Sequence, residues 1–372
     1  MLLKTSELKE VCAIILTAVD SNSQFKITET LEIVAENHKL YLNVTNKEYY
    51  VRVSLNIDSD EKFRAVIKAQ LFLNLISKTT VDQLELNVND SYLELIGNGK
   101  YKIPLIFEGD TLIKLPEINI ENITSSFDIS SEILHSIALY NSKAINKDEV
   151  VKSVQKMYYL DDKGCITFTN GACVNNFNLS NKIKVLLSDK IVKLFKLFKD
   201  SSISLSLGYD PISEDIIQTK IKLESSNICL TAILSCDDSL LSSVPAEAIR
   251  NRADKVYNYS VVLDRSELLG AINRLILFED KNSRGYFSKL IFNGESVAVH
   301  DSSNENEEVI FYENVVDTLL NESYEAVIDL FDLKIIIDSF KDKFINIKFG
   351  DHEAIVIARN NVFNIIPECK CN

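Results

Sequence analysis

The chain has 372 residues, of which 46% are hydrophobic and 25% are charged, with only ten glycines and five prolines. This composition excludes a long disordered tail, and the length suits two or three domains with separate cores. The formal net charge of -14 argues against a uniformly basic nucleic-acid-binding surface, although a basic groove within an acidic exterior gives the same sum.

The sequence indicates a cytoplasmic protein with reduced thiols. No apolar run reaches the roughly eighteen residues of a membrane span, and the first residues do not form a signal-peptide pattern. Cysteines are scattered at positions 12, 165, 173, 229, 236, 369 and 371. Because cytosolic cysteines seldom pair and no second pair accompanies the last two, we expect neither disulfides nor a zinc site.

In the first third of the chain, apolar residues at 8, 11, 12 and 15 predict a helix over residues 4–16. A second helix is predicted over residues 69–78. Alternating apolar and polar residues predict strands over 25–34, 39–44, 49–57, 83–88, 92–96 and 101–107.

The middle and last thirds repeat this order. Helices are expected over 131–144 and 189–198, and again over 266–278 and 330–340. The strands expected in the middle third are 157–160, 165–169, 203–207 and 218–234. In the last third they are 289–292, 296–300, 309–312, 344–349, 353–358 and 362–366.

The recurring order of helices and strands therefore predicts an internal repeat. A Ser-Glu-aliphatic start opens the first helix of each third, at Ser6, Ser131 and Ser266. We expect an α+β fold of three repeated domains, each with two helices and about eight short antiparallel strands, over residues 1–122, 123–254 and 255–372.

Catalytic motifs are missing from the sequence. Its histidines, at positions 38, 135, 300 and 352, have no partner at metal-ligand or triad spacing, and there is no P-loop, dinucleotide fingerprint or nucleophile elbow. Acidic pairs such as Asp161-Asp162 fall in predicted loops, where solubility explains them. We expect no enzyme, no cofactor and no metal.

Three segments carry a family resemblance: 268–274 (LLGAINR), 281–285 (KNSRG) and 364–367 (NIIP). With the order and length of the elements, the whole chain resembles the bacterial-type sliding clamp, the beta subunit of DNA polymerase III. The resemblance implies a head-to-tail homodimer ring that encircles double-stranded DNA without reading its sequence. It also implies that short linear peptides of the DNA polymerase and the clamp loader bind the ring.

The Asn, Ile and Lys bias suggests an AT-rich genome, so the clamp would be divergent, in a bacterial cell or virus-encoded in the host cytoplasm. Two other readings stay open. One is a clamp-like repeat scaffold that binds only proteins, and the other is a hydrolase whose active site matches no known sequence motif.

Basic side chains on or beside the predicted helices would face the DNA. The best candidates are Lys193 and Lys196, because the apolar residues of their helix define the opposite face. The full set is Lys9, Lys26, Lys68, Lys143, Lys152, Lys190, Lys193, Lys196, Arg274 and Lys334. The alternative is that these are the solvated side of ordinary helices.

The resemblance also implies a partner-peptide pocket of small and aliphatic residues between the second and third repeats. Its residues would be Val154, Thr169, Gly171, Ala172, Cys173, Val174, Pro245, Ile249, Arg250, Ile365, Ile366, Pro367 and Glu368. The family turn usually carries His-Arg where this chain has Ala172-Cys173, which predicts a pocket retuned to a different peptide. The alternative is a pocket that has decayed.

The dimer contact implied by the family joins the first repeat of one chain to the third repeat of the other. By position, it would involve Tyr101 and Ile103 on one side and Ile276 and Leu277 on the other. Alternatively, these are core residues of their own domains.

Overall fold

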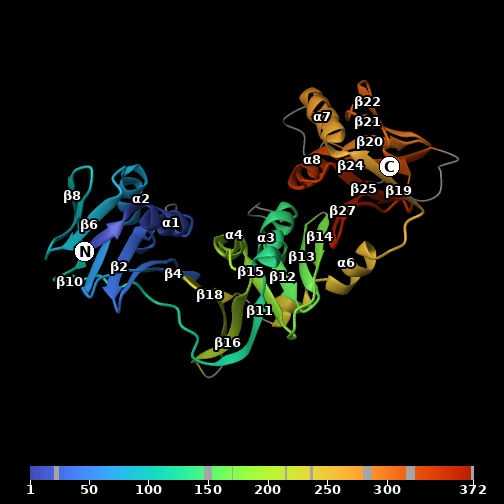
Figure 1. Cartoon of the computed structure of the whole chain (residues 1–372). Helices are drawn as coiled ribbons and strands as arrows, with labels where there is room; N and C mark the ends of the chain where they lie inside the picture. The colour runs from blue at the N-terminus through green and yellow to red at the C-terminus, as the bar shows by residue number, and fades with distance from the viewer. Residues whose placement is uncertain are drawn as a thin grey trace. The chain divides into compact units, whose positions relative to one another are not determined.

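The computed structural model describes residues 1–20, 25–145, 153–169, 171–213, 216–234, 238–279, 287–315 and 323–369. The chain forms two compact units, and Figure 1 labels many of their elements. The first unit comprises Met1–Leu134 and Lys190–Cys236, and the second comprises His135–Asp189 and Asp237–Asn372. The middle third of the chain therefore contributes to both units. Within the described residues, no helix has the length and apolar character needed to span a bilayer.

The first unit is built on an eight-stranded antiparallel sheet of order β11-β16-β17-β18-β4-β3-β2-β5 and a four-stranded sheet of order β1-β6-β7-β8. A short β9-β10 hairpin completes it. The strands of the large sheet are β2 (Thr30–Glu36), β3 (Lys39–Thr45), β4 (Tyr49–Asn56), β5 (Phe63–Lys68), β11 (Ile123–Ile129), β16 (Ile203–Ser213), β17 (Ile216–Glu224) and β18 (Ile228–Leu234). The others are β1 (Leu2–Lys4), β6 (Gln83–Val88), β7 (Tyr92–Ile96), β8 (Lys100–Pro104), β9 (Phe107–Glu108) and β10 (Thr111–Leu112).

The second unit has a nine-stranded antiparallel sheet of order β15-β12-β13-β14-β27-β26-β25-β19-β23 and a four-stranded sheet of order β22-β21-β20-β24. The strands of the large sheet are β12 (Met157–Asp161), β13 (Gly164–Phe168), β14 (Ala172–Asn176), β15 (Lys184–Ser188), β19 (Tyr259–Asp264), β23 (Asn314–Val315), β25 (Phe344–Phe349), β26 (Ala354–Arg359) and β27 (Val362–Pro367). The small sheet consists of β20 (Phe287–Phe292), β21 (Ser296–His300), β22 (Glu307–Phe311) and β24 (Tyr324–Asp329).

Helices come in pairs, as the repeat predicts. In the first unit, α1 (Thr5–Leu16) packs against α2 (Ala69–Lys78), and in the second α7 (Arg265–Leu275) packs against α8 (Leu330–Ser339). The chain passes between the units three times: within α3 (Ser131–Tyr140), at the start of α4 (Asp189–Leu194) and after Cys236. In the described ranges, two short helices and five 3-10 turns remain: α5 (Asp238–Ser242), α6 (Ala246–Ala253), η1 (Lys26–Glu29), η2 (Asn141–Lys143), η3 (Ser153–Lys156), η4 (Phe195–Leu197) and η5 (Ile276–Phe278).

Apolar residues of the helices and sheets form the cores. The expected stripe of α1 is confirmed, since all four of its apolar positions are buried: Leu8, Val11, Cys12 and Ile15. In the second unit, the rings of Phe292 and Phe349 stack with centroids 4.0 Å apart, and Tyr324 lies beside them. The alternation along β25 buries every second side chain, which is why that strand was visible in the sequence.

Three predicted strands were wrong in part, and the one expected over 101–107 is the end of β8 and the start of β9 with residues 105–106 between them. Residues 26–29 form η1 and not the start of a strand, because the Thr28 hydroxyl donates to the backbone carbonyl of Phe25 at 2.8 Å and so favours a turn. The single strand expected over 218–234 is two, since a turn at residues 225–227 separates β17 from β18. The backbone N–H of Ser225 donates to the carbonyl of Ile228 at 2.9 Å and closes this turn.

The α+β class is confirmed, with helices set on antiparallel sheets. Among the described residues, β1–β10, β11–β18 and β19–β27 give eight to ten strands to each third of the chain, with a helix pair in each. The domain boundaries at 122 and 254 stay predictions, because the two units of the structure divide the middle third between them.

Candidate peptide pocket, helix faces and strand edges

A small cavity of about 30 Å³ in the second unit gathers part of the predicted peptide pocket. Five of the predicted residues line it: Thr169, Gly171, Ala172, Ile365 and Ile366. Four others that were not assigned to it also line it, namely Lys143, Ala144, Asp332 and Ile336. The cavity therefore lies where the ends of β13 and η2 meet β14, β27 and α8.

The turn from β13 to β14 forms one wall of this cavity. The backbone N–H of Thr169 donates to the carbonyl of Gly171 at 2.7 Å, and Ala172 then pairs with Ile365 of β27. A Cβ at position 171 would lie 2.5 Å from the carbonyl oxygen of Ile365. Only glycine permits this close approach of two backbones.

The cavity carries two charged groups. Lys143, which the sequence assigned to DNA, is exposed at the end of η2. Asp332 lies in the first turn of α8, and burial together with the nearby Asp329 carboxylate raises its pKa. Sequence reasoning missed Asp332 and Ile336, although their i, i+4 spacing places both on one face of a helix.

The remaining pocket candidates lie elsewhere. Cys173 and Val174 are fully buried, and Cys173 belongs to the apolar core of the second unit. Val154 is also buried, within η3, while Pro245 and Ile249 belong to the start and body of α6, which packs against β14 and β27.

Arg250 of α6 has a structural contact that the sequence did not reveal. Its Nη1 and Nη2 donate to the two carboxylate oxygens of Asp161 at 2.9 and 2.7 Å. Both side chains are mostly buried, so this is a bidentate ion pair inside the second unit.

Glu368 also turns inward. Tyr324 donates its hydroxyl to the Glu368 carboxylate at 2.6 Å, and the His352 ring stacks on Tyr324. Burial raises the pKa of Glu368 in spite of that hydrogen bond. Glu368 therefore anchors the segment after β27, and neither it nor Pro367 lines the cavity.

The predicted buried and exposed helix faces agree best with the structure at α4 and η4. The apolar side chains there are all buried: Ile191, Val192, Leu194, Phe195 and Phe198. Lys193 and Lys196 are exposed on the opposite side. Their predicted orientation away from the core is confirmed.

The other basic candidates differ in their surroundings. Lys26, Lys68 and Lys143 are exposed, and Lys9 and Lys334 are half-exposed. Lys190 pairs with Asp20 and Glu48 at 3.4 and 3.5 Å, and Arg274 makes a bidentate ion pair with Glu308. Lys152 lies outside the described residues.

Two strand edges bear on the predicted dimer contact. β8 ends the small sheet of the first unit and β22 ends that of the second, and each pairs with a described strand on one side only. Tyr101 is half-exposed on β8, whereas Ile103 is 1% exposed within its own unit, which favours the core alternative for Ile103.

Exposed apolar residues lie on β22 and in η5, which directly follows the helix that contacts β22. Leu277 is 80% exposed, while Ile276 packs against the core of the second unit. Phe278 and Phe311, which the sequence did not single out, are about two-thirds exposed, at 65% and 66%. Since Arg274 and Glu308 join α7 to β22, we define Leu277, Phe278 and Phe311 as the apolar cluster of this edge.

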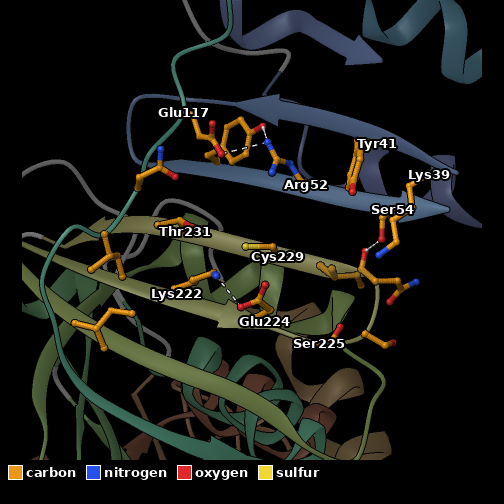
Figure 2. A pocket seen from close by; sticks show the side chains of 17 residues that line it. Lys39, Tyr41, Arg52, Ser54, Glu117, Lys222, Glu224, Ser225, Cys229 and Thr231 are labelled. Atoms are coloured by element: carbon orange, nitrogen blue, oxygen red, sulfur yellow. Dashed lines mark hydrogen bonds and ion pairs between the residues drawn. The ribbon is translucent and has the colours of Figure 1, made fainter. Parts of the chain in front are cut away.

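The first unit has a larger groove, of about 550 Å³, over strands β3, β4, β18 and β17 (Figure 2). Arg52 donates to Glu117 at 3.2 Å, and Lys222 pairs with Glu224 at 2.6 Å. These carboxylates offset two of the three cations that line the groove, the third being Lys39, so the groove presents no strong field of a single sign. No sequence motif pointed to it.

The segment over residues 113–122 is fastened beside this groove. Asp210 accepts the backbone N–H groups of Glu121 and Asn122 at 3.1 and 2.9 Å and pairs with Lys220 at 2.9 Å. Desolvation opposes the ionisation of Asp210, but Lys220 and these N–H groups together hold its pKa below the usual value. Within the described residues, no cluster of three or more side chains could hold a metal ion.

No protein-family model matches the sequence, and comparison with curated protein sequences gives no match either. Solved structures do match. The DNA polymerase III subunit beta of Borrelia burgdorferi, solved with a natural product, has a TM-score of 0.82 at 15% identity and matches 100% of this chain and 99% of that chain.

Two further structures give the same result. A Pseudomonas aeruginosa sliding clamp bound to griselimycin has a TM-score of 0.82 at 14% identity, and the Thermotoga maritima beta subunit has 0.78 at 16% identity. Each match covers 100% of this chain and 99% of the other. The chain is thus a divergent sequence with the fold of the bacterial DNA polymerase III beta subunits, the sliding clamps.

Proposed function

We propose that this protein is a DNA sliding clamp, which encircles duplex DNA and tethers a replicative polymerase without being an enzyme itself. The observation that carries the proposal is the end-to-end likeness of fold, over 100% of this chain and 99% of the beta subunits of Borrelia and Thermotoga. A match that includes every repeat supports a function that needs the whole chain.

Ring closure in this proposal joins β8 of one copy to β22 of a second copy, head to tail. Each of these strands has one edge without a described partner strand. Lys102 on β8 and Glu307 on β22 carry opposite charges, whereas Lys100 is paired with Glu94 and Glu308 with Arg274 within their own units. The exposed Leu277, Phe278 and Phe311 would become buried, which gives such a contact an apolar centre.

Duplex DNA would pass the helix faces that carry Lys193 and Lys196. A ring needs no base contacts, because weak attraction between lysines and phosphates suffices for sliding. The net charge of -14 is compatible with this as long as the cations gather on that face.

The cavity at Thr169, Ala172 and Ile366 would receive peptides from the polymerase and the clamp loader. Its aliphatic lining and its position at the junction of β14 and β27 suit an extended segment with an apolar anchor.

Topological retention tests the clamp proposal. The dimer is dissociated in mild denaturant, allowed to reassociate with nicked circular plasmid, and passed through a sizing column at moderate salt. We expect the protein to elute with the circles and to be lost once the circles are linearised. Dimers that never elute with circular DNA would overturn DNA encirclement and favour the protein-binding scaffold.

Peptide binding tests the pocket. Ile366→Asp should abolish the binding of clamp-binding peptides, and Thr169→Arg should do so by filling the cavity from a half-exposed position. Thr169→Arg is needed because Ile366 is buried and its variant could unfold. Phe363→Ser, on the same strand but not lining the cavity, is the control. Unchanged binding in Thr169→Arg would remove the pocket from the proposal.

A further inference from the structure

The cavity between β14, β27 and α8 holds an unbalanced charge. Asp332 is half-buried there and accepts no hydrogen bond or ion pair from any residue in the described part of the chain. The strongest charge acting on it is another carboxylate, that of Asp329, which is itself held at the start of α8 by the N–H of Phe331 at 2.8 Å. Burial therefore weakens the hydration of Asp332 without a compensating partner.

The second charged group of the cavity does not supply that partner. Lys143 projects from η2, is exposed, and forms no ion pair with Asp332 in the described structure. No lysine or arginine is among the groups that shift the pKa of Asp332. The turn at Ala172 and Cys173 adds neither a cation nor a hydrogen-bonding side chain, since Ala172 has none and Cys173 is fully buried.

The remaining walls are aliphatic. Ile336 follows Asp332 by one helical turn, and Ile365 and Ile366 come from β27. With a volume of about 30 Å³, the cavity admits one small aliphatic group before its walls must move. An apolar contact and a carboxylate therefore lie one turn apart along α8.

We propose that Asp332 determines which peptides this pocket accepts, by pairing with a lysine or arginine next to a small aliphatic anchor. The inference rests on the proposed peptide-binding function and names the chemical class of its partner. A cation placed on Asp332 gains a charge-assisted hydrogen bond in a partly desolvated site, whereas a glutamate there would meet two carboxylates. Asp332 thus selects for cationic segments.

Fluorescent synthetic peptides test the inference on the full-length dimer. Each contains Leu-Val-Leu within a Gly-Ser background, and Arg, Gln or Glu is placed in turn at each flanking position. We expect the best Arg peptide to bind about tenfold more tightly than its Gln counterpart, and the Glu peptide to bind weakest. In Asp332→Asn the preference for Arg over Gln should vanish, while the affinity for the Gln peptide changes less than about twofold.

Two variants make the test specific. Asp338→Asn makes the same charge change at an exposed position of the same helix and should leave the preference for Arg intact. Asp332→Lys should favour the Glu peptide. Binding that is blocked by Thr169→Arg but does not depend on the flanking charge would overturn the inference and leave the pocket in place. If no peptide binds, the pocket itself fails, and the inference with it.

Discussion

Arg250 illustrates how one residue can carry a role that its sequence position does not suggest. The family resemblance placed it on the wall of the peptide pocket, but its guanidinium is engaged by both oxygens of Asp161. Asp161 also accepts the backbone N–H of Lys163 at 2.9 Å and is 5% exposed. Arg250 therefore attaches α6 to the end of β12 within the second unit.

Replacing Arg250 should destabilise the second unit strongly. Arg250→Leu leaves the Asp161 carboxylate buried and without its cation, which costs about 3–5 kcal/mol when a buried pair loses one partner. Urea unfolding followed by circular dichroism measures this. Lys289→Leu is the control, because its pair with Glu325 is partly exposed and contributes less than about 1 kcal/mol. Equal losses in the two variants would contradict the structural role of Arg250.

Residue patterns correctly predicted which side chains face away from their own core. They did not predict which residues from different elements lie together. Lys193 and Lys196 could be placed outside the core because the apolar residues between and around them define one helix face. Asp332 could not be assigned to the pocket, since that depends on how α8 packs beside η2 and β27 and not on any spacing within α8. Ile103 has the same difficulty, because an aliphatic residue on an edge strand can face either its own core or a partner.

At the scale of single elements, the three repeated helix starts are not equivalent. α7 is capped by Asp264, whose carboxylate accepts the N–H groups of Ser266 and Glu267 at 2.8 and 3.2 Å. α1 begins after Lys4, which makes no side-chain cap bond. The shared Ser-Glu pattern therefore marks where these helices begin but does not cap α1 in the way that Asp264 caps α7.

Removing the α7 cap should lower stability in a pH-dependent way. Asp264→Ala should cost about 1 kcal/mol at neutral pH, and Asp264→Asn less, because an amide oxygen still accepts the backbone N–H groups. The Ser266 hydroxyl, with those N–H groups, lowers the pKa of Asp264 in the folded state despite its desolvation.

The sign of the pH effect follows from that lowered pKa. The stabilisation by the Asp264 carboxylate is fully present above the unfolded-state pKa of about 3.9 and is lost as the pH falls through the lower folded-state value. The difference in unfolding free energy between wild type and Asp264→Ala should therefore shrink in acid. A difference that stays constant from pH 7 to pH 3 would contradict this account.

The exposed apolar residues near the edge of β22 lead to a prediction about dimer formation. If the proposed dimer forms through this edge, Phe278→Ser with Phe311→Ser removes most of the apolar cluster and should convert that dimer to a monomer in sedimentation velocity. Phe331→Ser is the matched control, since this ring is 45% exposed on α8. The pair Ile276→Ala and Leu277→Ala should weaken the dimer as well. A dimer that survives all of these changes would place the contact elsewhere.

The strand β14 was not predicted, and the reason is physical. β14 has the sequence ACVNN, in which small and amide side chains replace the alternating β-branched residues that mark a strand. Its stability comes from pairing with β13 on one side and β27 on the other, so the information lies in distant segments. α2, β6, β7, β21 and β25 were predicted with correct bounds. In α2, β6 and β25 burial follows the local helical or strand period, whereas β7 and β21 each bury three consecutive residues.

For the whole molecule, a charge-reversal pair tests the DNA-facing assignment. Lys193→Glu with Lys196→Glu should shorten retention on circular plasmid and lower the slope of log affinity against log salt by about two, if both lysines contact phosphates. Lys62→Glu with Lys114→Glu changes the net charge equally at exposed positions outside the helices. Equal effects of the two pairs would mean that net charge alone governs retention.

The pairing of β14 with β27 has a consequence for how the protein is made. Ala172 to Asn175 must find Val362 to Ile365, yet these residues leave the ribosome roughly 190 residues later, or about ten to forty seconds at ordinary rates of synthesis. During that interval β14 is an open edge on which another nascent chain could add a strand. Alanine and asparagine are disfavoured in strands, so the low β-propensity that hid β14 in the sequence also makes it a weaker template for that error.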